Sequence, residues 1–176
     1  MRPVDSRIAS LIGLLIAIGG VGPAGADSTV TFGTNRDLVA GADALQRGRF
    51  EEGITRTQSG LDTFVTREQR TAALSNLCAG YTALGKYDVA VVHCSASLEL
   101  GPGWQAYNNR ALAYLGKGLI RLARRDYMEG LTLNPDAEQL LRVKELVEEA
   151  DRRRSGRDSR DPIVWSATDS SPDPNK

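Results

Sequence analysis

The side chains best suited to metal binding or nucleophilic chemistry are the two cysteines, Cys78 and Cys94, and the single histidine, His93. Three ligands at this spacing match no zinc-binding pattern. Reactive redox cysteines usually lie closer together, beside the start of a helix. We therefore expect no metal site, and we expect the two cysteines to form either a disulfide or a pair of buried thiols.

Sequence motifs of catalysis and cofactor binding are incomplete or missing. The chain has no GxSxG, no CxxC and no GxxxxGK followed by serine or threonine. Its 18 glycines are better explained by helical turns and close helix contacts than by a phosphate-binding loop. We therefore expect no enzymatic activity and no cofactor.

The length and charge of the chain restrict its class and its partners. A chain of 176 residues is enough for one domain and too short for two of ordinary size. The 22 basic and 22 acidic residues balance, whereas a protein that binds phosphate backbones needs a surplus of positive charge. Nucleic acid is therefore excluded as the main expected partner.

The first 26 residues have the pattern of a secretory signal peptide. Two arginines, an apolar run of fifteen residues and the small pair Ala24 and Ala26 follow one another. The run is short for a membrane span, which needs about 20 residues. We expect cleavage after Ala26, a periplasmic or secreted protein and no membrane span after cleavage; the alternative is an uncleaved anchor. Residues 27–33 are then a short lead-in.

The sequence pattern of a helical hairpin repeats along the remaining chain. Glycines that start the turns GRF, GKY and GLI stand at residues 48, 85 and 118, and prolines 102 and 135 repeat at 33 residues. A single hairpin cannot bury its own apolar face, so repeated hairpins must stack. The sequence alone therefore predicts an all-α stacked-repeat fold.

The repeats resemble the tetratricopeptide repeat (TPR) family, a 34-residue unit of paired antiparallel helices. The third repeat carries the family pattern at Tyr107, Ala111, Tyr114, Ala123, Tyr127, Gly130 and Pro135. The second carries it at Leu74, Cys78, Tyr81, Ala90, Ser97 and Pro102, with Cys94 replacing an aromatic residue. The first keeps the small residues Gly41, Gly53 and Gly60, but Ala44 and Val65 depart from the pattern.

This resemblance implies a right-handed α-solenoid of three TPR hairpins and a C-terminal capping helix. The expected ranges are 34–67, 71–103 and 104–137 for the repeats, 138–154 for the capping helix and 155–176 for a disordered tail. Capping boxes starting at Thr34 and Thr66 are expected to open the first two repeats. Asn134 and Pro135 are expected to open the capping helix. Within the tail, the apolar residues 163–165 (Ile-Val-Trp) form an island that could dock on another surface.

The same resemblance places a concave groove on the first helix of each hairpin. Its predicted wall is small, apolar and neutral, and its binding candidates are Leu38, Leu45, Ser75, Asn76, Thr82, Asn108, Asn109, Leu112 and Leu115. Asn76 and Asn109 share the sixth position of their repeats. They are expected either to pair with a peptide backbone as two rungs of a ladder or to bridge neighbouring helices. Some family members hold a terminal carboxylate with basic residues, and this chain lacks them.

The TPR register also brings the two cysteines face to face within one hairpin, so we expect a Cys78–Cys94 disulfide rather than two thiols. The predicted function is a non-enzymatic exported interaction module that binds an extended peptide or partner protein in its groove. Two alternatives remain. One is a structural assembly subunit that uses its convex face or edge, and the other is an envelope thiol-redox factor that uses Cys78 and Cys94.

Overall fold

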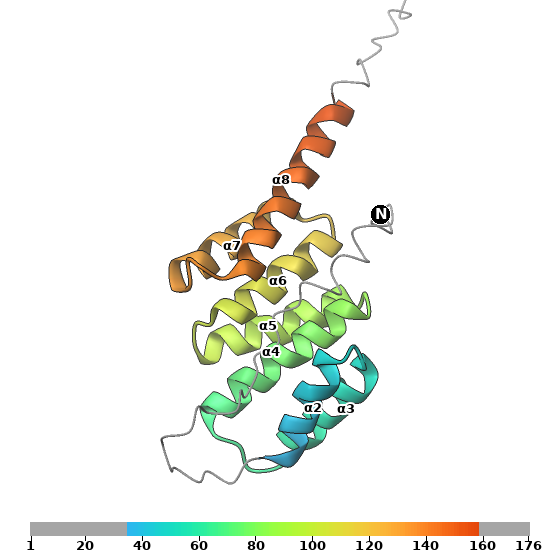
Figure 1. Ribbon diagram of the computed structural model, residues 1–176, viewed down its shortest axis with the longest axis vertical. Coiled ribbons are helices and arrows are strands. Elements are labelled where there is room, and N and C mark those ends of the chain that lie inside the picture. Colours follow the sequence, from blue (N-terminus) through green and yellow to red (C-terminus); the bar gives the residue numbers. More distant parts are fainter. Residues whose placement is uncertain (1–34, 159–176) are drawn as a thin grey trace, which may run out of the picture.

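The computed structural model describes residues 35–158. Over this range the chain forms seven helices and no strand. They are α2 (Arg36–Gln46), α3 (Phe50–Leu61), α4 (Arg67–Ala83), α5 (Tyr87–Leu100), α6 (Trp104–Gly116), α7 (Ile120–Leu133) and α8 (Glu138–Asp158). The first six pair as the hairpins α2–α3, α4–α5 and α6–α7, which stack in chain order with α8 at the end (Figure 1). The predicted all-α helical-repeat solenoid is confirmed.

Each hairpin turns at a glycine in the left-handed region of backbone conformation. Gly48, Gly85 and Gly118 have φ values of +74°, +71° and +72°. A residue with a Cβ atom rarely adopts this conformation, which explains why the sequence repeats glycine at these three places. The three turns are therefore equivalent, and they give the three hairpins the same tight connection.

Small residues let neighbouring helices approach closely, both within a hairpin and between hairpins. A Cβ atom on Gly41 would lie 2.4 Å from the hydroxyl of Thr57, and one on Gly116 would lie 2.3 Å from the ring of Tyr87. Both distances are shorter than real carbon contacts, so only glycine fits at these crossings. Gly41, one of the small positions predicted from the repeat pattern, is thus a point where two helices touch.

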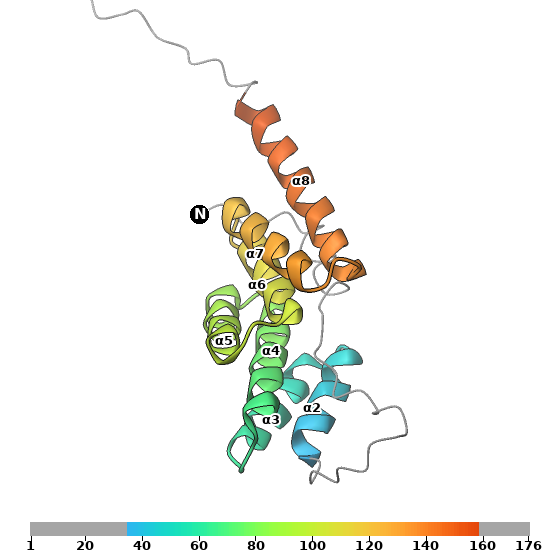
Figure 2. The same ribbon diagram turned by 90° about the vertical axis from the view of Figure 1, so that its left-hand side faces the viewer.

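Helix α8 closes the exposed end of the third hairpin. Leu140, Val143 and Val147 on one side of this helix are fully buried, together with Tyr127 and Leu112 of the hairpin. The rest of α8 extends beyond the stack, as Figure 2 shows from a second direction. The apolar stripe predicted for a terminal cap is therefore used as expected.

The helix boundaries confirm the predicted capping box at Thr66 and correct the predicted first cap. Thr66 and Gln69 form a complete capping box, and α4 then starts at Arg67, four residues before the predicted second repeat. The first cap is Asn35 rather than Thr34, because its side chain accepts a hydrogen bond from the Leu38 N–H.

The capping helix begins at Glu138, the first residue of its predicted range, and ends four residues later than predicted. The residues after Asn134 first make a turn in which the N–H of Ala137 bonds to the carbonyl of Asn134, so α8 begins at Glu138 rather than at Pro135. Its other end lies at Asp158, four residues beyond the predicted limit. The i,i+4 pair Glu149–Arg153 stabilises the turn that precedes this extension. The predicted signal peptide, the lead-in and the tail from residue 159 with its apolar island lie outside the described residues.

Candidate functional site

The predicted groove wall comes from the first helix of each hairpin. Helix α4 packs on both α2 and α6, so the first helices of the three hairpins lie next to each other. All nine predicted wall residues are buried, in the groups Leu38 and Leu45 on α2, Ser75, Asn76 and Thr82 on α4, and Asn108, Asn109, Leu112 and Leu115 on α6. The wall is therefore a packed apolar surface with a few enclosed polar groups.

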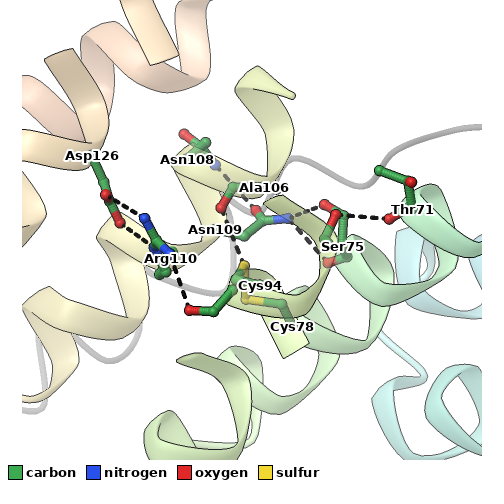
Figure 3. Close-up of a disulfide and its surroundings, with 11 residues drawn as sticks. Thr71, Ser75, Cys78, Cys94, Ala106, Asn108, Asn109, Arg110 and Asp126 are labelled. Atoms are coloured by element: carbon green, nitrogen blue, oxygen red, sulfur yellow. Dashed lines mark hydrogen bonds and ion pairs between the residues drawn. A yellow bond between two sulfur atoms is a disulfide. The ribbon is translucent and has the colours of Figure 1, made fainter. Parts of the chain in front are cut away.

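Asn109 joins α6 to α4. Its carboxamide nitrogen donates to the backbone oxygen of Ser75 at 3.3 Å and lies 3.4 Å from the Ser75 hydroxyl. Its oxygen accepts a hydrogen bond from the side-chain nitrogen of Asn108 at 3.2 Å, as Figure 3 shows. The sequence left two roles open for Asn109, pairing with a peptide backbone or bridging neighbouring helices. Its described contacts make the bridge between α6 and α4.

Asn76 differs from Asn109 although it holds the same place in its repeat. It is 4 % exposed, and its side-chain oxygen has no hydrogen-bond partner among the described residues. The hydroxyl oxygen of Thr82, which is 1 % exposed, likewise has no partner in this part of the chain. Buried polar atoms are almost always hydrogen-bonded in folded proteins. Asn76 and Thr82 therefore leave α4 with two enclosed groups that a bound molecule could satisfy.

A cavity of about 380 Å³ lies where α4 and α6 begin. Its lining includes Ser75 of the predicted wall and further residues that the sequence analysis did not select: Arg67, Thr71, Ser97, Leu100 and Gln105. Two glycines that flank Pro102 in the link from α5 to α6 also line it. A side chain added at Gly101 would meet no atom within 4 Å. The Gly-Pro-Gly link is thus the feature of the sequence that indicates this cavity, because it supplies almost no side-chain volume to fill it.

The cavity has a polar edge formed by Arg67. The Nε atom of Arg67 donates to the carbonyl oxygen of Leu100 at 2.8 Å and so satisfies a carbonyl at the end of α5. The Ser97 hydroxyl on α5 likewise donates to the Thr71 carbonyl on α4 at 2.9 Å. These bonds hold α4 and α5 together at this end and leave the cavity between α4 and α6 unfilled.

The two cysteines form the expected disulfide. Cys78 on α4 and Cys94 on α5 are joined with a Cα–Cα distance of 5.3 Å, and both are fully buried. The bond lies beside Asn109 and Arg110 in Figure 3. Thiol exchange requires that an attacking thiolate reach a sulfur atom. Because neither sulfur is accessible in the folded chain, this arrangement fits a structural crosslink better than a redox centre.

His93 contacts Tyr81 on the outer side of the same hairpin. Their rings stack with centroids 5.3 Å apart and an angle of 3° between the planes. Burial lowers the pKa of the His93 imidazole below its usual value, since a charged ring loses hydration there. Within the described residues, no group of three metal-ligating side chains comes together.

An ion pair between the partly buried Arg110 and the buried Asp126 fixes α6 against α7. The guanidinium of Arg110 makes two hydrogen bonds to the Asp126 carboxylate, at 2.7 and 2.9 Å, and a third to the Ser95 hydroxyl at 3.0 Å. Desolvation opposes the charge on Arg110, but the hydrogen bond and attraction of Asp126 outweigh it and raise the Arg110 pKa. The preceding residue is Asn109, so this ion pair also fixes the helix that carries the Asn109 bridge.

A partial phosphate-loop pattern lies at the end of α4 and in the turn that follows it. The stretch from Gly80 to Lys86 has the spacing GxxxxGK, but Tyr87 stands where a phosphate loop has serine or threonine. Residues 80–83 belong to helix α4 rather than to a loop. Gly80 itself lies against Ile54 and Leu45, where a Cβ atom would come within 3.0 Å of their side chains. The pattern is thus explained by helix packing.

Comparisons with known proteins agree with this architecture. No protein-family model matches the chain, and no curated protein sequence matches it. Among solved structures, the first TPR domain of human RPAP3 aligns with a TM-score of 0.60 at 20 % identity, over 68 % of this chain and 93 % of that domain. The second TPR domain of human RPAP3, solved in complex with the HSP70 peptide SGPTIEEVD, aligns with a TM-score of 0.56 at 19 % identity, over 64 % and 92 %.

The described helices therefore form a TPR-like solenoid. This conclusion concerns the fold, because both similar structures are only about one-fifth identical in sequence. Among helices α2 to α8, none is long and apolar enough to cross a membrane.

Proposed function

We propose that this protein is an exported, non-enzymatic interaction module that binds an extended peptide segment of a partner protein along α2, α4 and α6. The observation that carries the proposal is the pair of buried oxygen atoms on Asn76 and Thr82, which lack partners in the described part of the chain. The cavity that begins beside Ser75 offers space for a side chain on the same helix.

The chemistry of the wall selects an uncharged peptide. None of its nine residues carries a charge, and its polar members are amides and hydroxyls. A carboxamide can both donate to and accept from a peptide backbone, whatever side chains that peptide carries. The similar RPAP3 domain, solved with an HSP70 peptide, supports peptide binding as a use of this fold.

Export is supported by the disulfide and by the signal-like first 26 residues. Internal disulfides persist mainly in oxidising compartments such as the periplasm or the extracellular space. The absence of catalysis is supported by the state of the residues best suited to chemistry, since both cysteines are crosslinked and His93 is stacked on Tyr81.

A selection of random peptides displayed on phage tests the proposal. Selected peptides are synthesised and titrated onto the unchanged protein, Asn76→Leu and Val92→Lys. The first variant removes the enclosed carboxamide, and the second alters a side chain that is 65 % exposed on α5. We expect Asn76→Leu to weaken binding at least fivefold and Val92→Lys to have no effect. The reverse order of effects would place the binding face on α5 and reject the groove.

The second candidate is assembly through the convex side. Val89 and Val92 lie three residues apart on α5 and are 41 % and 65 % exposed. Residues at this spacing share one face of a helix, so they form a small apolar strip. Assembly through this strip predicts that Val92→Lys breaks up an oligomer detectable by light scattering, whereas Asn76→Leu leaves that oligomer intact.

A further inference from the structure

The cavity between the starts of α4 and α6 carries two opposite charges at its mouth. Among its described lining residues, the charged ones are Arg67 and Glu68, which are neighbours in the first turn of α4. Both are exposed, as is Pro102 on the other side of the cavity, whereas Ser97 and Ala106 in its lining are buried. The two charges therefore stand where the cavity meets solvent.

The guanidinium of Arg67 is fixed in place and keeps donors to spare. Its Nε and Nη2 atoms both donate to the carbonyl oxygen of Leu100, the first at 2.8 Å. Its Nη1 atom has no hydrogen-bond partner among residues 35–158, and no described carboxylate forms an ion pair with it. A guanidinium has five N–H donors in a planar fork that matches a carboxylate. Arg67 can therefore bind a carboxylate without releasing Leu100.

The carboxylate of Glu68 remains charged beside Arg67. A hydrogen bond from its own backbone N–H, a second from the Thr66 hydroxyl and attraction by Arg67 lower the pKa of the Glu68 carboxyl. An ionised carboxylate offers about four acceptor positions, so these bonds leave room for another donor. Glu68 can therefore accept from an ammonium group at the same mouth.

The interior of the cavity suits a small apolar group. Ala72, Leu100 and Ala106 line it, and the hydroxyls of Ser75 and Ser97 are already hydrogen-bonded to neighbouring helices. The volume of about 380 Å³ is near the lower end of the roughly 300–1,000 Å³ typical of small-molecule sites. A ligand that fits is thus a small molecule with a short apolar body.

The pair of charges selects the polar end of this ligand. Glu68 would repel a simple anion and Arg67 would repel a simple cation. A free α-amino acid has a carboxylate and an ammonium on one carbon atom, and both are charged near neutral pH. The interior of a peptide chain has neither group. The mouth therefore complements a free amino acid better than an internal peptide segment.

We propose that this cavity binds a free α-amino acid with an apolar side chain, with its carboxylate on Arg67, its ammonium on Glu68 and its side chain against Leu100. The site goes beyond the proposed function and does not depend on it. A bound amino acid takes the space that the proposed function offers to a peptide side chain, so the two ligands exclude each other there.

Isothermal titration calorimetry on the purified full chain tests this proposal. The probes are L-leucine, L-leucinamide, which lacks the carboxylate, and N-acetyl-L-leucine, which lacks the ammonium. Each is titrated onto the unchanged protein, Arg67→Gln, Glu68→Gln and the matched control Arg70→Gln. Arg70 is exposed on the same helix and lies outside the cavity lining. Thermal melting followed by circular dichroism checks that every variant is folded.

We expect the unchanged protein and Arg70→Gln to bind L-leucine about tenfold more tightly than either derivative, since a hydrogen bond between charged groups contributes at least that much affinity. Arg67→Gln should remove the advantage of L-leucine over L-leucinamide. Glu68→Gln should remove its advantage over N-acetyl-L-leucine.

No binding of L-leucine to the unchanged protein would overturn the proposal, and so would equal affinity for all three probes. An advantage of L-leucine that survives in both Arg67→Gln and Glu68→Gln would also overturn it. If one variant does not fold, the other still decides. These outcomes leave the proposed function to its own test, because the phage-selected peptides are measured independently.

Discussion

The side-chain nitrogen of Asn109 on α6 lies 3.3 Å from the backbone oxygen of Ser75 on α4. This contact ties two neighbouring repeats together through a fully buried carboxamide. Asn76, at the same repeat position on α4, has an oxygen without a partner in the described chain. Two asparagines that the sequence pattern treats as equivalent therefore have different surroundings, and this difference can be measured.

Replacing Asn109 with alanine should destabilise the protein, and replacing Asn76 with leucine should not. Asn109→Ala leaves the Ser75 groups unsatisfied, which typically costs about 1–3 kcal/mol. Asn76→Leu removes a buried acceptor that has no described partner and roughly keeps the side-chain volume, so we expect no loss of unfolding free energy. Urea unfolding of both variants measures the difference. Equal losses of unfolding free energy would show that Asn76 is a structural bridge as well.

The disulfide should stabilise the second hairpin and resist modification. Removing it in Cys78→Ala/Cys94→Ala frees a loop with a sequence separation of 16 and should cost roughly 3 kcal/mol in the chain-entropy estimate. Denaturant unfolding of the variant and the unchanged protein gives this value. In the folded protein, we expect no thiol to react with a maleimide, even after brief treatment with a mild reductant. Rapid reduction under native conditions would instead favour the thiol-redox alternative.

The ion pair between the partly buried Arg110 and the buried Asp126 should matter much more than an exposed pair. Asp126→Asn leaves the guanidinium without its carboxylate in a protected place, and losses of about 3–5 kcal/mol are typical of broken buried pairs. The matched control is Asp37→Asn, which breaks the exposed Arg56–Asp37 pair and should cost less than about 1 kcal/mol. Thermal unfolding of both variants measures the contrast. Similar melting temperatures would show that the Arg110 contacts are unimportant for the fold.

Stability should fall as the pH drops through the range where histidine titrates. Because burial lowers the pKa of folded His93, the unfolded chain binds the proton more tightly than the folded one. The contribution of His93 is therefore complete above the unfolded pKa of about 6.5 and declines below it. His93→Phe keeps a ring beside Tyr81 and removes the titration. Between pH 7.5 and 5.5, the melting temperature of this variant should fall less than that of the unchanged protein; parallel curves would contradict the assignment.

Most of the fold follows from features that repeat along the sequence. The turn glycines, the small residues at helix crossings and the apolar stripe of α8 are all local patterns, and each has the role that its chemistry requires. The exact ends of the helices were harder to predict from the sequence. Whether Thr34 or Asn35 caps α2 depends on contacts with Gly60 and Thr63, about 25 residues away.

The site was predicted less completely than the fold. Repeat position identified which residues belong to the wall, and it also paired the cysteines correctly. It could not separate Asn109 from Asn76, because their difference arises from neighbours on other helices. The cavity was missed because its lining combines the start of α4, the end of α5 and the link to α6, and that combination has no repeating signature.

Site-directed photo-crosslinking in the producing cell tests the central claim most directly. A benzophenone amino acid is placed either at Ala72, which lines the cavity on α4, or at Val92 on the outer face of α5. Each form is irradiated, and crosslinked products are identified by mass spectrometry with and without an excess of a phage-selected peptide. A groove that binds peptides predicts crosslinks to a partner segment from position 72 that the peptide suppresses, and none from position 92. Crosslinks from position 92 alone, unaffected by the peptide, would contradict the account.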